Sequence, residues 1–164
     1  MERSTIRMLR IGLALLAAGA VQPAFSLAAD EDDVRAAFQS FQQALKAGDP
    51  DKIWPLMDKA SQDAAEKNAR TLCEGYEKAV AKKKAEIEKA MGLSAAELAK
   101  LNGKLYTKSK RFLGKKPYDE IPTSKIDKVA VSGDKATIHY IEADGDKLEI
   151  VAVRQDGKWK FSPR

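Results

Sequence analysis

The chain has 164 residues, of which 32% are charged, and its formal net charge is +5. A chain of this length suits one domain and leaves too little sequence for two comfortable hydrophobic cores. The single cysteine, Cys73, excludes an intramolecular disulfide, and one cysteine with one histidine excludes the usual zinc ligand sets. Cys73 is expected to pack as a small hydrophobic residue rather than to act as a nucleophile.

Residues 1–29 are expected to form a cleavable secretory signal peptide. The segment begins with positive charges at Arg3, Arg7 and Arg10. An apolar run over residues 11–21 follows, about half of the roughly 20 residues that a membrane-spanning helix needs. Small residues precede Asp30, so cleavage is expected just before it, although a cut after Ser26 also fits. The mature chain, with a formal charge of +3, is expected to be soluble and periplasmic or secreted.

Two helices are predicted at the start of the mature chain. Apolar residues recur at helical spacing in Val34, Phe38, Phe41 and Leu45. Asp32 or Asp33 is expected to cap this first helix, and Gly48 to end it. Asp49 and Pro50 then resemble a cap and a first-turn proline, so a short second helix containing Trp54 is expected.

A helical region is predicted for about residues 62–116. Ser61 opens a polar helix that reaches Met91, and Gly75 inside it is expected to weaken or break it. Ser94 and Glu97 have the spacing of a capping box, so a further helix is expected to start there. Leucines at helical spacing and Phe112 lie along one face of it, whereas Gly103 disfavours its second half.

The remainder of the chain alternates with a period of two residues and predicts four strands. These are expected at residues 124–131, 136–142, 148–154 and 158–161, separated by Gly-Asp and Asp-Gly turns that favour hairpins. Three successive hairpins form an antiparallel meander. Helices followed by a meander predict an α+β fold, in which N-terminal helices pack on a curved antiparallel sheet.

Short motifs near both ends of the mature chain resemble the nuclear-transport-factor-2-like superfamily, which includes the SnoaL-like proteins and is built as a cystatin-like cone. They are the Ala-Leu-Lys-Ala-Gly-Asp sequence of residues 44–49, the Trp54 helix, and the strand and turn sequences of residues 131–137 and 156–160. The resemblance implies a cone-shaped α+β domain, residues 30–164, with a pocket between the sheet and the helices. It also implies either a pure binding role or an isomerase or dehydratase activity, and a homodimer through the outer face of the sheet.

His139 is the candidate catalytic base, because enzymes of this architecture often place a histidine or aspartate in the cone. It lies mid-strand, with Ile138 and Tyr140 on the opposite side, and either side of that strand can be the core side. Tyr140 or Glu142 is the candidate assistant, and a structural or solvent-facing histidine is the alternative. No partner for the base is identifiable from the sequence. The candidate ligand pocket comprises Trp54, Tyr76, His139, Tyr140 and Trp159, and both tryptophans also suit the core.

A basic stretch between Glu97 and Asp119 is the second candidate surface. If one helix continues through Gly103, then Lys100, Lys104, Lys108 and Arg111 line one side of it. Such an amphipathic helix suits an anionic envelope surface, and a merely solvated helix face is the alternative. Nucleic acid is not expected as a partner.

No metal and no cofactor is expected, since Asp144-Gly145-Asp146 is too short for a calcium loop. Three functions remain open. The first is a non-catalytic exported binding or accessory module for a small apolar ligand or a partner segment. The others are an isomerase-like or dehydratase-like enzyme and an envelope-surface protein.

Overall fold

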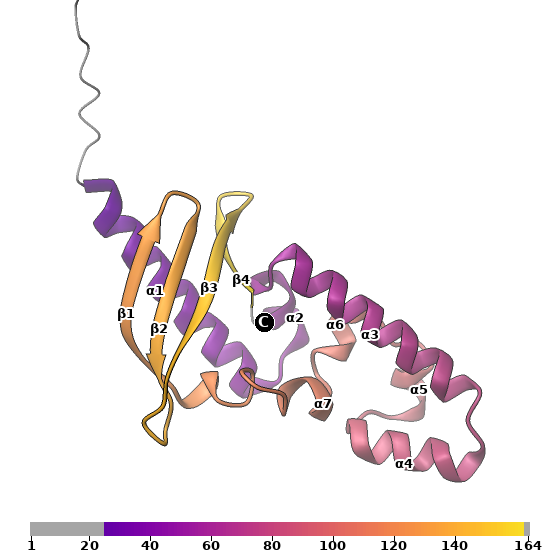
Figure 1. Ribbon diagram of the computed structural model, residues 1–164. Coiled ribbons are helices and arrows are strands. Elements are labelled where there is room, and N and C mark those ends of the chain that lie inside the picture. Colours follow the sequence, from indigo (N-terminus) through magenta and orange to yellow (C-terminus); the bar gives the residue numbers. More distant parts are fainter. Residues whose placement is uncertain (1–24, 163–164) are drawn as a thin grey trace, which may run out of the picture.

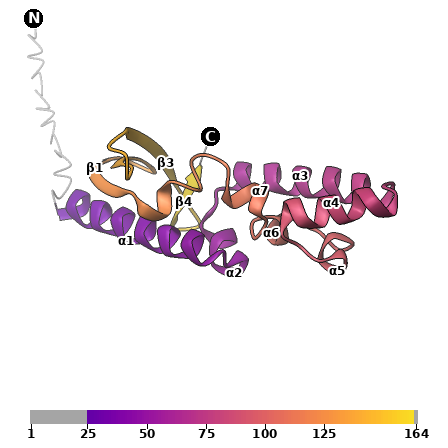
Figure 2. The same ribbon diagram turned by 90° about the horizontal axis from the view of Figure 1, so that it is seen from below.

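The computed structural model describes residues 25–162, so most of the expected signal peptide lies outside the described residues. A four-stranded sheet lies across one long helix, and a set of shorter helices extends to one side (Figures 1 and 2). The predicted α+β fold, with helices packed on an antiparallel sheet, is confirmed. Of the helices in residues 25–162, none combines the length and the apolar character that crossing a bilayer requires.

Helix α1 (Phe25–Ala47) runs beneath the sheet. The predicted stripe of Val34, Phe38, Phe41 and Leu45 is buried, with no side chain more than 4% exposed. The helix begins earlier than expected, so Asp32 and Asp33 lie inside it rather than capping it. It ends as predicted, because Gly48 has a φ of +60°, which glycine adopts without the steric cost of a Cβ atom.

The chain turns sharply after Gly48. Asp49 caps α2 (Pro50–Ile53) by accepting a hydrogen bond from the Asp51 N–H at 3.0 Å, as the Asp-Pro pair predicts. The short 3₁₀ helix η1 (Trp54–Leu56) follows, since Pro55 prevents continuation of the α-helix.

Four strands form the sheet in the order of the sequence: β1 (Lys125–Ser132), β2 (Lys135–Ile141), β3 (Lys147–Gln155) and β4 (Lys158–Ser162). All neighbours are antiparallel, so the predicted meander is confirmed to within a residue or so at each strand end. An irregularity between Ile126 and Lys128 shifts the register of β1 against β2.

Aromatic side chains fill the space between α1 and the sheet. Phe41 stacks on Phe161 with ring centroids 5.0 Å apart, and Phe38 contacts Phe161 at 5.7 Å and Tyr140 at 5.9 Å. All four residues are at most 1% exposed. Burying each such ring stabilises the fold by about 1.5–3 kcal/mol, so this cluster is the main link between helix and sheet.

The helical arm, residues 59–116, contains α3 (Lys59–Glu77), α4 (Ala81–Met91), α5 (Ala95–Leu98), α6 (Gly103–Tyr106) and α7 (Lys110–Leu113). It corresponds to the helical region predicted for about 62–116 and projects away from the sheet (Figure 1). The Asp58 carboxylate caps α3 by accepting from the Ser61 N–H at 2.8 Å, so this helix begins before Ser61. Helix α3 ends at Glu77, beyond Gly75, and Gly92 ends α4 as predicted.

The predicted helix start at Ser94 is confirmed, but a continuous helix through Gly103 to Phe112 does not form, because the segment forms three short helices. Each has its own polar cap: Ser94, Asn102 and Ser109 accept from the N–H of the residue three positions later. The Ser94–Glu97 capping box is confirmed. Local caps in mid-segment compete with the continuous helix that the leucine spacing favours, and here the caps prevail.

After the arm, the 3₁₀ helix η2 (Ile121–Thr123) leads into β1. The side chain of Gln42 in α1 fixes this segment by donating to the carbonyls of Ile121 and Ser124, both at 2.9 Å. One amide therefore connects the η2 segment to α1.

Candidate functional site

His139 lies on the face of the sheet that points away from α1. In β2 the side chains of Ala136, Ile138 and Tyr140 are buried against the helix, whereas His139 is partly exposed on the other face. Its Nδ1 lies 3.7 Å from an Oε2 of Glu149 on β3, and its side chain is 42% exposed. His139 and Tyr140 therefore point to opposite faces and do not line one pocket.

The other residues of the predicted pocket are also separated. Tyr76 lies in the arm, where its hydroxyl donates to Glu88 at 2.7 Å. Trp159 is 5% exposed, and the Arg154 guanidinium lies 4.6 Å from its ring centroid. Trp54 lies where η1 meets α6. The expected five-residue pocket is thus not assembled, because α1 already fills the core face of the sheet.

The predicted basic surface is likewise divided. Lys100, Lys104, Lys108 and Arg111 lie on different short segments of the arm rather than on one helix face. Lys104 pairs with Asp51, and Lys108 pairs with Glu97 at 2.8 Å. Lys108, and then Ser94, lower the pKa of Glu97 to about 2. Two of the four cations are therefore neutralised locally.

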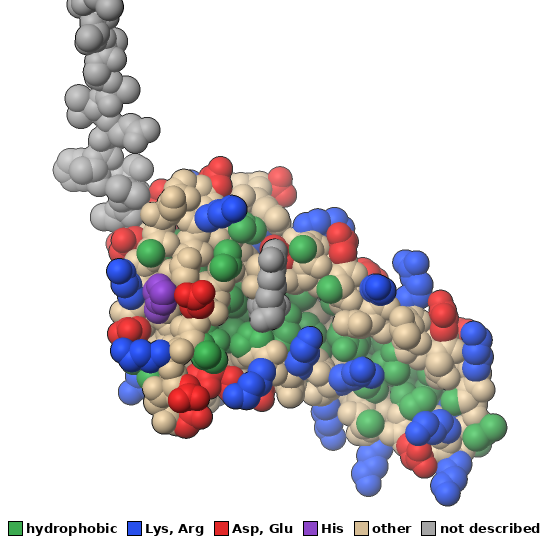
Figure 3. Space-filling model, in the orientation of Figure 1, with side chains coloured by type: hydrophobic (Ala, Val, Ile, Leu, Met, Phe, Trp, Pro, Cys, Tyr) green, Lys and Arg blue, Asp and Glu red, His purple; other side chains and the backbone are tan. Residues whose placement is uncertain are grey.

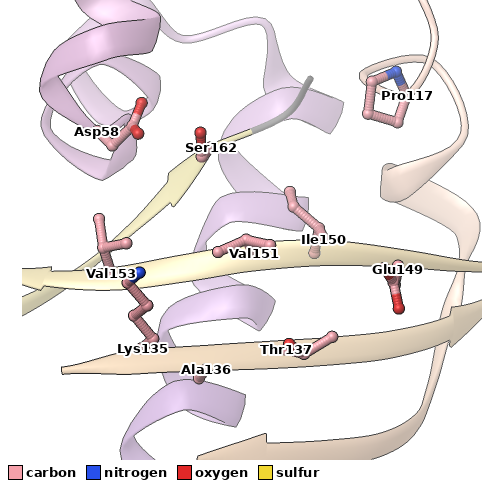
Figure 4. Close-up of a pocket in the computed structure, with 10 residues that line it drawn as sticks. All are labelled: Asp58, Pro117, Lys135, Ala136, Thr137, Glu149, Ile150, Val151, Val153 and Ser162. Carbon is pink, nitrogen blue, oxygen red and sulfur yellow. The ribbon is translucent and has the colours of Figure 1, made fainter. Parts of the chain in front are cut away.

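The candidate binding site is a hollow of about 550 Å³ beside β3 (Figure 4). Sequence reasoning missed it, because its walls come from distant segments. They include Asp58 before α3, Pro117 after the arm, and Thr137, Ile150, Val151 and Val153 of the sheet. In Figure 4, Ile150 lies at the edge of β3 that faces the gap towards Pro117.

Strand pairing explains why this hollow exists. β4 pairs with β3 only between Val151 and Gln155 of β3, where Val151 lies opposite Ser162. The first half of β3, residues 147–150, is paired with β2 on one side and with no described strand on the other. Among the described residues, that side of the half-strand is therefore open, as at the edge of a sheet.

The hollow has both apolar and polar walls. Val151 is 40% exposed, one of three large apolar side chains in the described residues that are this accessible. Asp58 is 5% exposed, its carboxylate caps α3, and its N–H donates to the Phe161 carbonyl at 2.9 Å. Lys135 and Glu149 contribute opposite charges to the rim.

Charge is divided unequally between the arm and the rest of the molecule. The arm holds 15 lysines and arginines against seven acidic residues, a formal charge of +8. Residues 30–58 and 117–162 together hold ten basic and 16 acidic residues, a formal charge of −6. Basic side chains are spread along the arm in Figure 3, and acidic ones gather at the lower end of the sheet.

A buried pair of carboxyl groups lies near that lower end. Glu142 follows β2 and is 6% exposed, and its carboxyl group faces that of Glu120 before η2. Burial, and then the adjacent Glu120, raise the pKa of Glu142 to about 7. Lys116 pairs with Glu120 and holds the pKa of Glu120 below its usual value.

Comparison with protein-family models, curated proteins and solved structures finds no match for this chain. The protein is therefore classified by its fold alone. It is an α+β protein with a four-stranded antiparallel meander, one long helix packed on the sheet and a helical arm. Membership of the nuclear-transport-factor-2-like superfamily stays a prediction from the short motifs.

Proposed function

We propose that this chain is an exported, non-catalytic binding module that receives an extended segment of a partner protein beside β3. The observation that carries the proposal is the open half-strand at residues 147–150, which borders the hollow of about 550 Å³. A partner strand hydrogen-bonds to such an edge through its backbone, and its alternate side chains enter the adjacent pocket.

Apolar contacts in the hollow supply the specificity of this binding mode. Val151 and Val153 project from the same face of β3 and line the hollow next to the open half-strand, in the part of β3 that β4 pairs. Covering about 100 Å² of apolar surface contributes about 2.5 kcal/mol before ordering costs, so affinity in the micromolar range needs several backbone hydrogen bonds as well.

The enzyme alternative has less geometric support. A general base needs a substrate within hydrogen-bond reach and protection from water, and His139 projects from the uncovered sheet face. Tyr140, its expected assistant, is 1% exposed on the other face. Binding rather than turnover is the function that these positions favour.

A peptide-display selection on the purified protein tests the proposal. Selected peptides are expected to slow amide exchange in residues 147–150, and V151K is expected to weaken their binding at least tenfold. V80K is the matched control, because Val80 is 73% exposed in the arm, away from the hollow. Peptides that bind V151K as tightly as the unmodified protein, or leave exchange at the edge unchanged, would contradict the proposal.

Native mass spectrometry of protein recovered from the periplasm or medium of an expressing bacterium tests export and the nature of the ligand. A mass that begins at Asp30 supports export. A co-purifying small apolar molecule that V151K removes and V80K retains would replace the partner segment as the occupant of the same hollow.

The arm supports a second candidate function, contact with an anionic envelope surface, since its formal charge is +8. Lys100 and Arg111 are exposed, and reversing both charges is expected to weaken binding to phosphatidylglycerol vesicles at least threefold at 0.1 M salt. Reversal of Lys125 and Lys128 on β1 is the control. Equal binding by both double variants would refute a role of the arm.

A further inference from the structure

Three carboxyl groups converge at the end of the β2–β3 hairpin, and a fourth faces one of them. Glu142, Asp144 and Asp146 each place a carboxylate oxygen so that the three atoms lie within 4.8 Å of one another. Glu120, from the segment before η2, faces Glu142. The hairpin loop is closed by the Glu142 N–H, which donates to the Asp146 carbonyl at 2.9 Å.

Two oxygens in this cluster are buried without a hydrogen-bond donor among the described residues. They are Oε2 of Glu120 and Oε1 of Glu142, and the Glu142 side chain is 94% buried, being 6% exposed. A buried carboxylate oxygen without a donor is costly, and two that face each other are more so. Such a pair needs either a shared proton or a cation between its oxygens.

We propose that Glu142, Asp144 and Asp146 bind a calcium ion, with Glu120 beside it as a neighbouring negative charge. Calcium takes carboxylate oxygens at about 2.3–2.6 Å, so two of its ligands are at most about 5 Å apart, which the 4.8 Å spread of the cluster satisfies. Calcium also tolerates irregular coordination with several waters, which suits a site with two exposed aspartates.

The surroundings of the site both support and oppose a cation. Lys116 pairs with one oxygen of Glu120, and its side chain is 71% exposed, so it can move into solvent when an ion binds. Asp144 Oδ1 accepts from the Asp146 N–H at 3.2 Å, which leaves Oδ2 for a metal. Four carboxylates against one ammonium leave an excess of negative charge. This site is independent of the hollow beside β3.

Calorimetric titration of calcium chloride into the EDTA-treated protein at pH 8 tests the proposal. One saturable site is expected, with a Kd of about 0.1–1 mM, as in weak extracellular calcium modules. At 10 mM calcium the Tm is expected to rise by about 3–6 °C. The double variant D144N/D146N is expected to lose at least tenfold in affinity and to lose the rise in Tm.

D134N is the matched control, because Asp134 is an exposed turn aspartate at the other end of the same sheet. It is expected to bind calcium like the unmodified protein. Since both substituted aspartates of the double variant are exposed, far-ultraviolet circular dichroism is expected to show an intact fold. No saturable binding at pH 8, or full affinity in D144N/D146N, would overturn the proposal and leave a shared proton as the explanation for the Glu120–Glu142 pair.

Discussion

Replacing Gly103 with alanine is expected to destabilise the protein by forcing α6 away from α3 and from Trp54. An added Cβ atom would lie 2.8 Å from the backbone nitrogen of Glu66 in α3 and 2.8 Å from the Cη2 atom of Trp54. Gly103 is buried at the start of α6, and its φ is not positive, so space rather than backbone conformation requires glycine here.

The magnitude follows from the nature of the contacts. A flexible side chain can move away from a Cβ atom at 2.8 Å, but the Glu66 backbone can move only if α3 shifts. Overpacking of this kind costs about 1–3 kcal/mol, partly offset by the higher helix propensity of alanine. A net loss of about 1–2 kcal/mol is expected.

Urea unfolding monitored by circular dichroism and tryptophan fluorescence measures this loss. Gly75, which lies in α3, is the control position. A Cβ atom added there meets no atom within 4 Å. G75A is expected to gain about 0.5–1 kcal/mol from helix propensity alone. If G103A is as stable as G75A, then α3 and α6 do not need a residue without a side chain at their contact, and the reasoning fails.

Three further predictions concern the core, a cap and a titrating group. F38A is expected to lose about 3–5 kcal/mol in free energy of unfolding, because Phe38 is fully buried against Tyr140; a loss below 1 kcal/mol in urea would contradict this. S94A is expected to lose about 1 kcal/mol, because it removes one half of the capping box, and the same measurement with no change would show that the cap is dispensable. In EDTA, Tm is expected to fall as the pH rises from about 5 to 8. The reason is that Glu142 has a pKa of about 7 in the folded state, so it keeps a proton there at a pH at which the unfolded chain has already lost it. E142Q is expected to reduce this fall in Tm. If calorimetry gives E142Q the same dependence of Tm on pH as the unmodified protein, the pH dependence does not come from the cluster of Glu120, Glu142, Lys116 and Asp144.

The strands and the first helix could be predicted because their signals are local. Alternation and Asp-Gly turns place the four strands within a residue or so, and the spacing of Val34, Phe38, Phe41 and Leu45 identifies the buried face of α1. The face of β2 that carries His139 could not be predicted, because both faces of this strand hold apolar residues. Only the position of α1, set by long-range packing, decides between them.

The candidate sites escaped prediction for a related reason. Asp58 and Pro117 are far apart in sequence and meet β3 only in the folded chain. Glu120 and Glu142 are brought together by the path from η2 into the sheet, which no local pattern reveals. The breaks in the basic segment did have a signal, since Asn102 and Ser109 are good caps, but leucine spacing pointed to one helix.

The unequal division of charge makes this small molecule a large electric dipole. With a formal charge of +8 on the arm and −6 on the remainder of residues 30–162, a modest net charge hides two strongly charged ends. In dilute buffer the arm of one copy is attracted to the sheet of the next, so association between copies is favoured. Added salt screens this attraction within about 10 Å at 0.1 M. Association between copies is therefore expected to weaken, and solubility to increase, as ionic strength rises. This is the reverse of salting out.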